Sequence, residues 1–284
     1  MQPNIRYPAV AEEFYPSETH ELEALLETLF RDKPAPDKGN KVRGLIVPHA
    51  AYRYCGQVSA KAFSSAAGRA YRTVFLMGNA HAYLFDGIAI DPHEAWSSPI
   101  GKVPVNRKLS RKLTKAAPGL FHELDIAHHC DHVLEVQIPF LQHALAPGFT
   151  ILPMLFGENS PDIYRKAADS IMSVMSDEDL IVASTDLSHY PSYRDAGKID
   201  HVTLEHMTNR DVENLERHES EVMQRIIPGA TSAFCSPDAV KTLLEIARRK
   251  GWTPGEPTYL NSGDTAHDDR LAVVGYGSVS FSET

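Results

Sequence analysis

The chain has 284 residues, 43% of them hydrophobic and 23% charged, an ordinary composition for one large α/β domain. Its formal net charge of -9 argues against a broad phosphate-binding face, and so against nucleic acid as a partner. No apolar run approaches the roughly 18 residues that cross a bilayer, and the first residues lack the pattern of a secretory signal. We therefore expect a cytoplasmic protein with no membrane partner, folded as a single domain over residues 1–284.

The first half of the chain alternates between helical and strand patterns. Apolar residues follow a helical stripe through 22–30, for which Ser17 is the expected N-cap. A buried strand at 43–47 stops just before His49, and a helix of mostly small residues at 54–67 leads to a second buried strand at 73–77. This β-α-β order predicts parallel strands if both belong to one sheet.

The second half continues the alternation. Further strands are expected at 87–90, 150–156, 180–184, 257–261 and 271–281, and further helices at 105–116, 160–175, within 204–227, and up to Lys250. Ser236 and Pro237 occupy the N-cap and N1 positions of the last helix. Together these patterns predict an α/β fold with a mainly parallel or mixed central sheet flanked by helices.

Histidines follow three of the predicted strands: His49 after the first, His81 after the second and His189 after the third. In open α/β sheets, ligands bind at the carboxyl ends of the strands, where loops from several strands meet. Cys235 lies just ahead of a helix, whose N-terminus should lower the pKa of the thiol. If the strands of His49 and His81 are neighbours, these two imidazoles and the Cys235 thiolate form a three-ligand metal site with an open position.

Such a donor set suits iron, copper or zinc. In the alternative interpretation the two histidines cap strand ends and Cys235 is a small buried hydrophobic residue. The three cysteines, Cys55, Cys130 and Cys235, are an odd number, which argues against a disulfide framework and for a reducing compartment.

Other polar residues near these positions are candidates for proton transfer. Asp186 and His189 either form a carboxylate-oriented base, or Asp186 caps a helix that holds His189. His132, with Asp131 and Glu135, either supplies another acid or base or begins a surface helix. The chain has no G-x-S-x-G elbow and no G-x-G-x-x-G after a strand, which argues against a serine hydrolase and a dinucleotide site.

Ordered motifs along nearly the whole chain resemble the Memo family, the B component of the AmmeMemoRadiSam system. They are IRYPAVAEEFYP (5–16), VPHAAYRYCG (47–56), GNAH (78–81), DHVLEVQIPFLQ (131–142), STDLSHY (184–190), Cys235, NSGD (261–264) and VVGYGSVSF (273–281). That family resembles the class III extradiol ring-cleaving dioxygenases in fold, which implies a site at one end of the sheet. The resemblance also implies that His49, His81 and Cys235 are the metal ligands, with Asp186, His189 and His132 around the pocket.

The chain departs from the family pattern at two places. The usual Gly-Pro-Ser-His-His reads Gly78-Asn79-Ala80-His81-Ala82 here, and the usual Cys-Gly reads Cys235-Ser236. True ring-cleaving dioxygenases use a carboxylate where this chain offers a thiolate, so dioxygenase activity does not follow from a shared fold.

These observations favour a non-haem metal-dependent redox enzyme of undefined substrate. Iron or copper ranks above zinc as its cofactor, and His189, oriented by Asp186, or His132 would move a proton. The resemblance also implies a functional link to a radical-SAM protein. The alternative from another class is a non-catalytic protein that binds a peptide or small molecule in a dioxygenase-like pocket.

Overall fold

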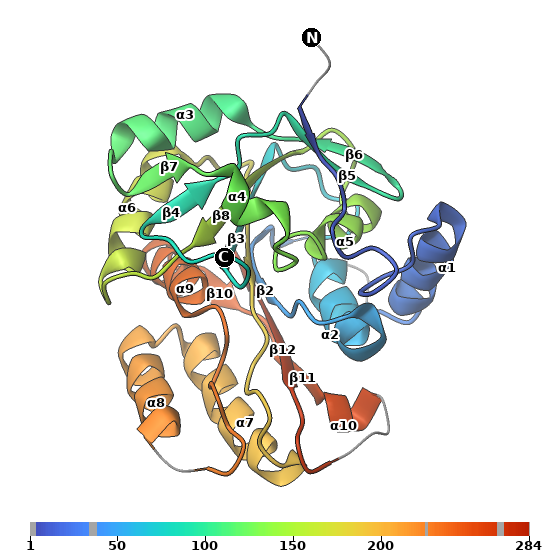
Figure 1. Ribbon diagram of the computed structural model, residues 1–284, viewed down its shortest axis with the longest axis vertical. Helices are drawn as coiled ribbons and strands as arrows, with labels where there is room; N and C mark the ends of the chain where they lie inside the picture. Colours follow the sequence, from blue (N-terminus) through green and yellow to red (C-terminus); the bar gives the residue numbers. More distant parts are fainter. Residues whose placement is uncertain (1–3, 34–38, 225–226, 266–269, 284) are drawn as a thin grey trace.

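The computed structural model describes residues 4–33, 39–224, 227–265 and 270–283 and shows a mixed sheet between two layers of helices (Figure 1). Over these residues the main sheet has the strand order β10-β12-β2-β9-β3-β8-β4-β7, with β11 paired to β12. Its strands are β2 Val42–Val47, β3 Thr73–Asn79, β4 Ile88–Ile90, β7 Phe121–Glu123, β8 Thr150–Phe156, β9 Leu180–Ser184, β10 Thr253–Pro254, β11 Thr258–Asn261 and β12 Gly275–Ser282. A small second sheet contains β1 Ile5–Arg6, β5 Ala95–Ser98 and β6 Gly101–Pro104.

The helices occupy the segments between these strands. They are α1 Thr19–Phe30, α2 Tyr52–Ser64, α3 Arg107–Ala116, α4 Asp125–His129, α5 Gln137–Ala144, α6 Ile163–Val174, α7 Tyr193–Asn209, α8 Val212–Gln224, α9 Pro237–Lys250 and α10 Ser262–Thr265. The charged segment predicted as helical at 204–227 is thus divided between α7 and α8, and its residues 225–226 lie outside the described part. Among the described helices, none has the length and apolar character needed to span a bilayer.

The central strands β2, β9, β3 and β8 are parallel, whereas β12 and β4 pair antiparallel at either side. The predicted α/β fold with a mainly parallel or mixed sheet is therefore confirmed. The expectation that the strands before His49 and His81 are neighbours is wrong, because β9 lies between β2 and β3. Along the chain, β8 first pairs with the side of β3 that is away from β2, and β9 then pairs between β2 and β3. The position of β9 therefore depends on contacts between residues that are distant in sequence.

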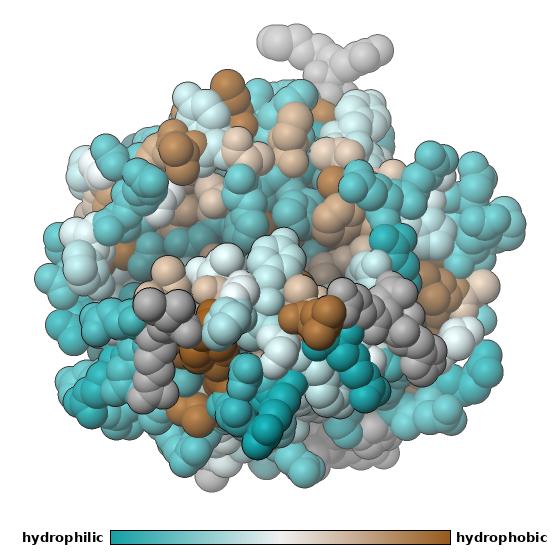
Figure 2. Space-filling model, turned by 60° about the horizontal axis from the view of Figure 1, so that its bottom comes forward, coloured by the Kyte–Doolittle hydropathy of each residue, from teal (hydrophilic) through white to brown (hydrophobic). Residues whose placement is uncertain are grey.

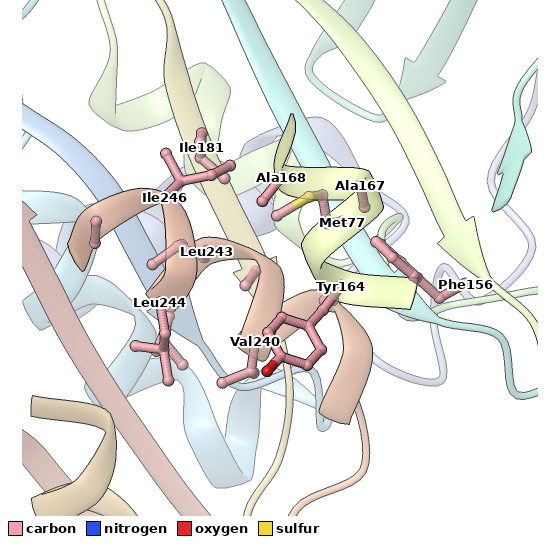
Figure 3. Packing of buried hydrophobic residues seen from close by; sticks show 14 of the residues in the cluster. Met77, Phe156, Tyr164, Ala167, Ala168, Ile181, Val240, Leu243, Leu244 and Ile246 are labelled. Carbon is pink, nitrogen blue, oxygen red and sulfur yellow. The ribbon is translucent and has the colours of Figure 1, made fainter. Parts of the chain in front are cut away.

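Both faces of the central strands are covered, which explains their continuous apolar sequences. In β2, Leu45 and Val47 belong to the core shared with α1, α2 and α5, whereas Ile46 belongs to the core on the opposite face. Figure 3 shows this second core, in which side chains of α6 and α9 pack toward β3, β8 and β9. The face that carries α7, α8 and α10 is mainly hydrophilic, with hydrophobic residues in small separate groups (Figure 2).

Two helix starts differ in detail from the predictions. The N-cap position of α1 is Glu18, and the hydroxyl of Ser17 instead donates to the Glu12 carboxylate over 2.9 Å. Helix α9 begins at Pro237 with Ser236 at its N-cap position, as predicted, but the Ser236 hydroxyl does not cap it. That hydroxyl accepts the backbone N–H of Asn79 over 3.1 Å.

The segment around Glu135 differs more strongly from the prediction. Helix α5 begins only at Gln137 and is mostly buried, so His132 is not in its first turn and the predicted surface helix is wrong. The buried Glu135 carboxylate accepts from Arg6 Nη1 over 2.8 Å, from the Tyr15 hydroxyl over 2.7 Å and from two backbone amides of the N-terminal segment. Glu135 therefore anchors the N-terminal segment, and its lone pairs are committed to that task.

Glu135→Gln should lower the free energy of unfolding by about 3–5 kcal/mol, because it leaves the Arg6 charge buried without its counterion. Both side chains of this pair are 2% exposed. Lys198→Gln, which removes one partner of the exposed Lys198–Asp195 pair, is the control and should cost less than about 1 kcal/mol. Urea denaturation of both variants measures the difference, and equal losses would contradict the structural role given to Glu135.

Asp200, inside α7, anchors the loop that carries His189. Its fully buried carboxylate accepts the backbone N–H of Ser188 over 2.9 Å. A Cβ added at Gly275 would lie 2.0 Å from its Oδ2, so β12 needs glycine where it passes Asp200. Burial raises the pKa of Asp200 to about 6, because the low-polarity surroundings disfavour the charged form.

The raised pKa of Asp200 predicts a pH dependence of stability. An unfolded Asp loses its proton near pH 4 and the folded one near pH 6, so the free energy of unfolding falls as the pH rises between these values. The loss is about 3 kcal/mol for two pKa units, complete above pH 6. Asp200→Asn should remove this loss, so its stability relative to the parent should rise from pH 4 to pH 7. Parallel stability curves for the two proteins in urea denaturation would contradict the assignment.

Candidate metal centre

Three adjacent parallel strands, β2, β9 and β3, end at the same edge of the sheet. His49 follows β2, Asp186 follows β9, and His81 follows β3. Cys235 reaches this edge because α9, which begins two residues later, packs against β3 and β9. One ligand atom each of His49, His81 and Cys235 lies within 4.8 Å of the other two. The structure thus brings together the three residues that were predicted as metal ligands.

The imidazole of His49 is held by its Nδ1 atom. The Ser184 hydroxyl donates to the carbonyl of Val133 over 2.6 Å, so its lone pairs accept from Gln137 Nε2 over 2.9 Å and from His49 Nδ1 over 3.2 Å. His49 is therefore the Nδ1–H tautomer. Its Nε2 lone pair faces the Cys235 Sγ atom at 3.2 Å.

His81 is held in the same way by a different group. Its Nδ1 lies 2.9 Å from the carbonyl oxygen of Asn79, which can only accept, so Nε2 carries the free lone pair. The backbone N–H of His81 donates to the buried carboxylate of Asp131 over 2.7 Å. The rings of His49 and His81 lie 5.1 Å apart between centroids and are nearly perpendicular. The two histidines thus each present Nε2 while the backbone around them is fixed.

Cys235 is joined to the end of β9 by reciprocal hydrogen bonds. Its N–H donates to the Asp186 carbonyl, and the Asp186 N–H donates to its Sγ, both over 3.2 Å. Burial, with the nearby Asp186 carboxylate, raises the pKa of the Cys235 thiol to about 12. The expectation of a lowered thiol pKa is therefore wrong, because burial and the Asp186 carboxylate both disfavour the thiolate.

Three histidines at or beside the cluster, His49, His132 and His189, are neutral at neutral pH. Burial lowers the pKa of His49 well below its usual range, and the neighbouring histidines lower it further. Burial also lowers the pKa of His132 and of His189. Neutral imidazoles have the lone pair that a metal or a proton requires.

Two imidazole nitrogens and one sulfur fit a transition metal, whereas Mg²⁺ and Ca²⁺ prefer oxygen ligands. His49 is buried, Cys235 is half-buried and His81 is exposed, so the cluster opens to solvent on the His81 side. This geometry matches a site with protein ligands on one side and a free coordination position on the other.

His132 lies beside this cluster, with ring centroids 5.5 Å from His49 and 5.8 Å from His81. Phe14 packs on His132 at 4.7 Å and also lines a surface pocket of about 480 Å³. The pocket is lined by Glu12, Glu13, Phe14, Tyr15, Pro16, Ser17, Glu18, Glu21, Leu25, Tyr52 and Arg53. Since four carboxylates and one guanidinium line it, the pocket favours a neutral or cationic ligand over an anionic one.

The sequence suggested that Asp186 either orients His189 or caps a helix that holds it, and the structure shows neither arrangement. The buried Asp186 carboxylate accepts the backbone N–H of His49 over 2.8 Å, and burial raises its pKa to about 7. The described contacts include no hydrogen bond between Asp186 and His189, so the predicted orientation of His189 by this carboxylate is wrong. The residues between them are not helical either, so Asp186 is no helix cap. His189 Nε2 is buried and has no hydrogen-bond partner among the described residues.

Sequence reasoning missed Ser184, Gln137 and the carbonyl of Asn79, which together orient the two imidazoles. Ser184 ends an otherwise apolar strand, and Gln137 stands in an apolar stretch. These two positions were the only features of the sequence that indicated buried polar side chains. A polar residue at a buried position requires partners, and these partners lie more than 40 residues away in sequence.

Ser184→Ala should release His49 from the Nδ1–H tautomer, because the replacement removes the acceptor that fixes it. Nitrogen chemical shifts of the imidazole rings, measured by NMR on metal-free protein, report the tautomer of each histidine. The variant should show a mixture of tautomers at His49, while His81, held by the Asn79 carbonyl, serves as the internal control. An unchanged His49 tautomer would show that Ser184 does not determine it.

Comparison with known proteins gives a consistent result. Residues 6–280 match the family described as Memo-like protein. The chain is similar to MEMO1 family proteins of Ignicoccus hospitalis (31% identity, covering 98% of both chains), Sulfolobus acidocaldarius (31% identity, covering 98% of this chain and 100% of the relative) and Nitrosopumilus maritimus (29% identity, covering 98% and 99%). The motifs, the mixed α/β fold and this near-complete match lead to one conclusion: the chain belongs to the Memo family.

Proposed function

We propose that this Memo-family protein is a metal-dependent redox enzyme that holds one iron or copper ion on His49, His81 and Cys235. The observation that carries the proposal is the convergence of the three side chains within 4.8 Å. The Nδ1 atoms of both imidazoles are engaged by Ser184 and by Asn79, which leaves the Nε2 atoms for a ligand. Residues that merely cap strand ends would not require two separately fixed tautomers beside one thiol.

The donor set supports iron or copper ahead of zinc. Imidazole and thiolate bind all three metals, but a soft thiolate beside two imidazoles also suits ions that change oxidation state. A bound iron or copper ion would supply one-electron chemistry and a coordination position for a small ligand. Because the pKa of free Cys235 is raised to about 12, metal binding must release the thiol proton.

Residues of the chain itself can hold and move that proton. The pKa of about 7 makes the Asp186 carboxyl able to gain or lose a proton near neutral pH. His132 and His189 are neutral at that pH and have a nitrogen available to accept a proton. We assign proton transfer to these three residues, with Asp186 acting independently of His189.

The remaining parts of the proposal derive from the sequence resemblance. They are a small-molecule or peptide ligand as the partner of the site and a functional link to a radical-SAM protein; the proposed cytoplasmic location instead follows from the absence of a secretory signal pattern in the first residues. The exposed His81 supports access of such a ligand to the cluster, because this side of the site faces solvent.

Elemental analysis of protein purified without oxygen or a histidine tag tests the proposal. The parent should contain about one iron or copper per chain, because three protein ligands form a single site. His49→Ala and Cys235→Ala should each abolish binding. His20→Ala and Cys130→Ser, at exposed positions outside the cluster, are the matched controls and should keep the full metal content.

A parent that takes up no iron or copper even after anaerobic reconstitution would contradict the redox proposal. Stoichiometric zinc alone would contradict it as well, since zinc has no redox chemistry. Binding of a peptide or small molecule that persists in the presence of a chelator would then identify the site as a recognition pocket.

A further inference from the structure

Asn79, the last residue of β3, contacts both His81 and the segment that carries Cys235. Its carbonyl accepts from His81 Nδ1 over 2.9 Å, and its backbone N–H donates to the hydroxyl of Ser236 over 3.1 Å. Ser236 is fully buried and directly follows Cys235. The backbone of one residue therefore spans the distance between two of the three candidate ligands.

The side chain of Asn79 makes a second set of contacts with the same segment. Its Oδ1 accepts the backbone N–H groups of Asp238 over 3.1 Å and Ala239 over 3.3 Å. These groups belong to the first turn of α9, which has no cap from its own N-cap side chain. Its Nδ2 also donates to the Asp238 carboxylate over 3.3 Å. Asn79 thus caps α9 from outside the helix and ties its N-terminus to the end of β3.

The opposite side of the Cys235 segment is fixed to the two residues that follow β9. The Ser236 N–H donates to Thr185 Oγ1 over 3.1 Å, and the Cys235 N–H donates to the Asp186 carbonyl. With Asn79 on one side and residues 185–186 on the other, the segment is held between two strand ends. Without the Asn79 contacts, residues 185–186 would hold the segment from one side, and Cys235 could move relative to His81.

We propose that Asn79 is a positioning residue that, through Ser236 and the first turn of α9, sets the position of Cys235 relative to His81 in the metal centre. This proposal rests on the proposed function, since it assigns Asn79 a role in metal geometry. A purely structural role would be helix capping, which stabilises a helix wherever it lies in the fold. A positioning role predicts an additional effect on the metal and on the Cys235 thiol.

The chain contains a matched control for helix capping. Asn106 caps α3 with its Oδ1, which accepts the Leu109 N–H over 3.1 Å, and its Nδ2 donates to Thr73 Oγ1 over 2.8 Å. Like Asn79, it joins a helix N-terminus to β3, but at the opposite end of that strand. Asn106→Ala should therefore cost a similar amount of stability without affecting the metal centre.

The experiment compares the parent with Asn79→Ala, Ser236→Ala and Asn106→Ala, using Co²⁺ as the spectroscopic probe. Sulfur-to-cobalt charge-transfer absorption reports the Cys235 bond, and titration gives the affinity. We expect Asn79→Ala and Ser236→Ala each to weaken Co²⁺ binding by about 10–100-fold, as for the loss of residues that orient metal ligands, and to alter the charge-transfer band. Asn106→Ala should leave the spectrum unchanged and the affinity within about twofold, because its contacts lie outside this set.

A second readout does not depend on metal. Alkylation of Cys235 in the metal-free proteins, followed by mass spectrometry of its peptide, should be several-fold faster in Asn79→Ala and Ser236→Ala than in the parent and in Asn106→Ala. If the parent shows no thiolate band, the metal proposal fails, and the alkylation rates then test whether Asn79 positions Cys235. Equal spectra and equal alkylation rates in all four folded proteins would overturn the role of Asn79.

Discussion

The parallel arrangement of β2, β9 and β3 is the constraint on which the site depends. Parallel strands place all their carboxyl ends at one edge, so residues from three distant parts of the chain meet there without long loops. The central position of β9 matters most. It supplies Ser184, which orients His49, and leads directly to Asp186, whose backbone anchors Cys235. The middle strand therefore contributes no proposed ligand, but it organises ligands on either side.

Local patterns in the sequence were sufficient for much of this arrangement. The apolar runs before His49, His81 and His189 predicted three buried strands, and the order of elements predicted the α/β fold. The order of the strands in the sheet could not be predicted from local patterns, because the position of β9 between β2 and β3 depends on packing across the whole sheet. The role of Glu135 could not be predicted from them either, since its partner Arg6 lies 129 residues away.

The two departures from the Memo pattern also become intelligible only in three dimensions. The pattern that the resemblance implies has proline, which has no N–H group, where this chain has Asn79, and glycine, which has no hydroxyl, where it has Ser236. In this chain the Asn79 N–H donates to the Ser236 hydroxyl, so each departure supplies the partner of the other. Two substitutions that look independent along the sequence are one interaction, placed beside two of the proposed ligands.

Burial explains why the centre requires this degree of organisation. In the free protein the raised pKa of Cys235 keeps its sulfur protonated, and the lowered pKa values of the surrounding histidines keep them neutral. Without a bound cation, the cluster thus avoids the free-energy cost of buried charge. When a cation binds, the Cys235 thiol must lose its proton. The His49 Nε2 atom faces the Cys235 sulfur at 3.2 Å, and the Asp186 carboxyl, whose pKa is about 7, accepts the His49 backbone N–H, so two groups that can take up a proton adjoin the thiol. The same low-polarity surroundings that suppress the thiolate would then strengthen its attraction to a bound cation, because charges interact more strongly where the effective dielectric constant is low.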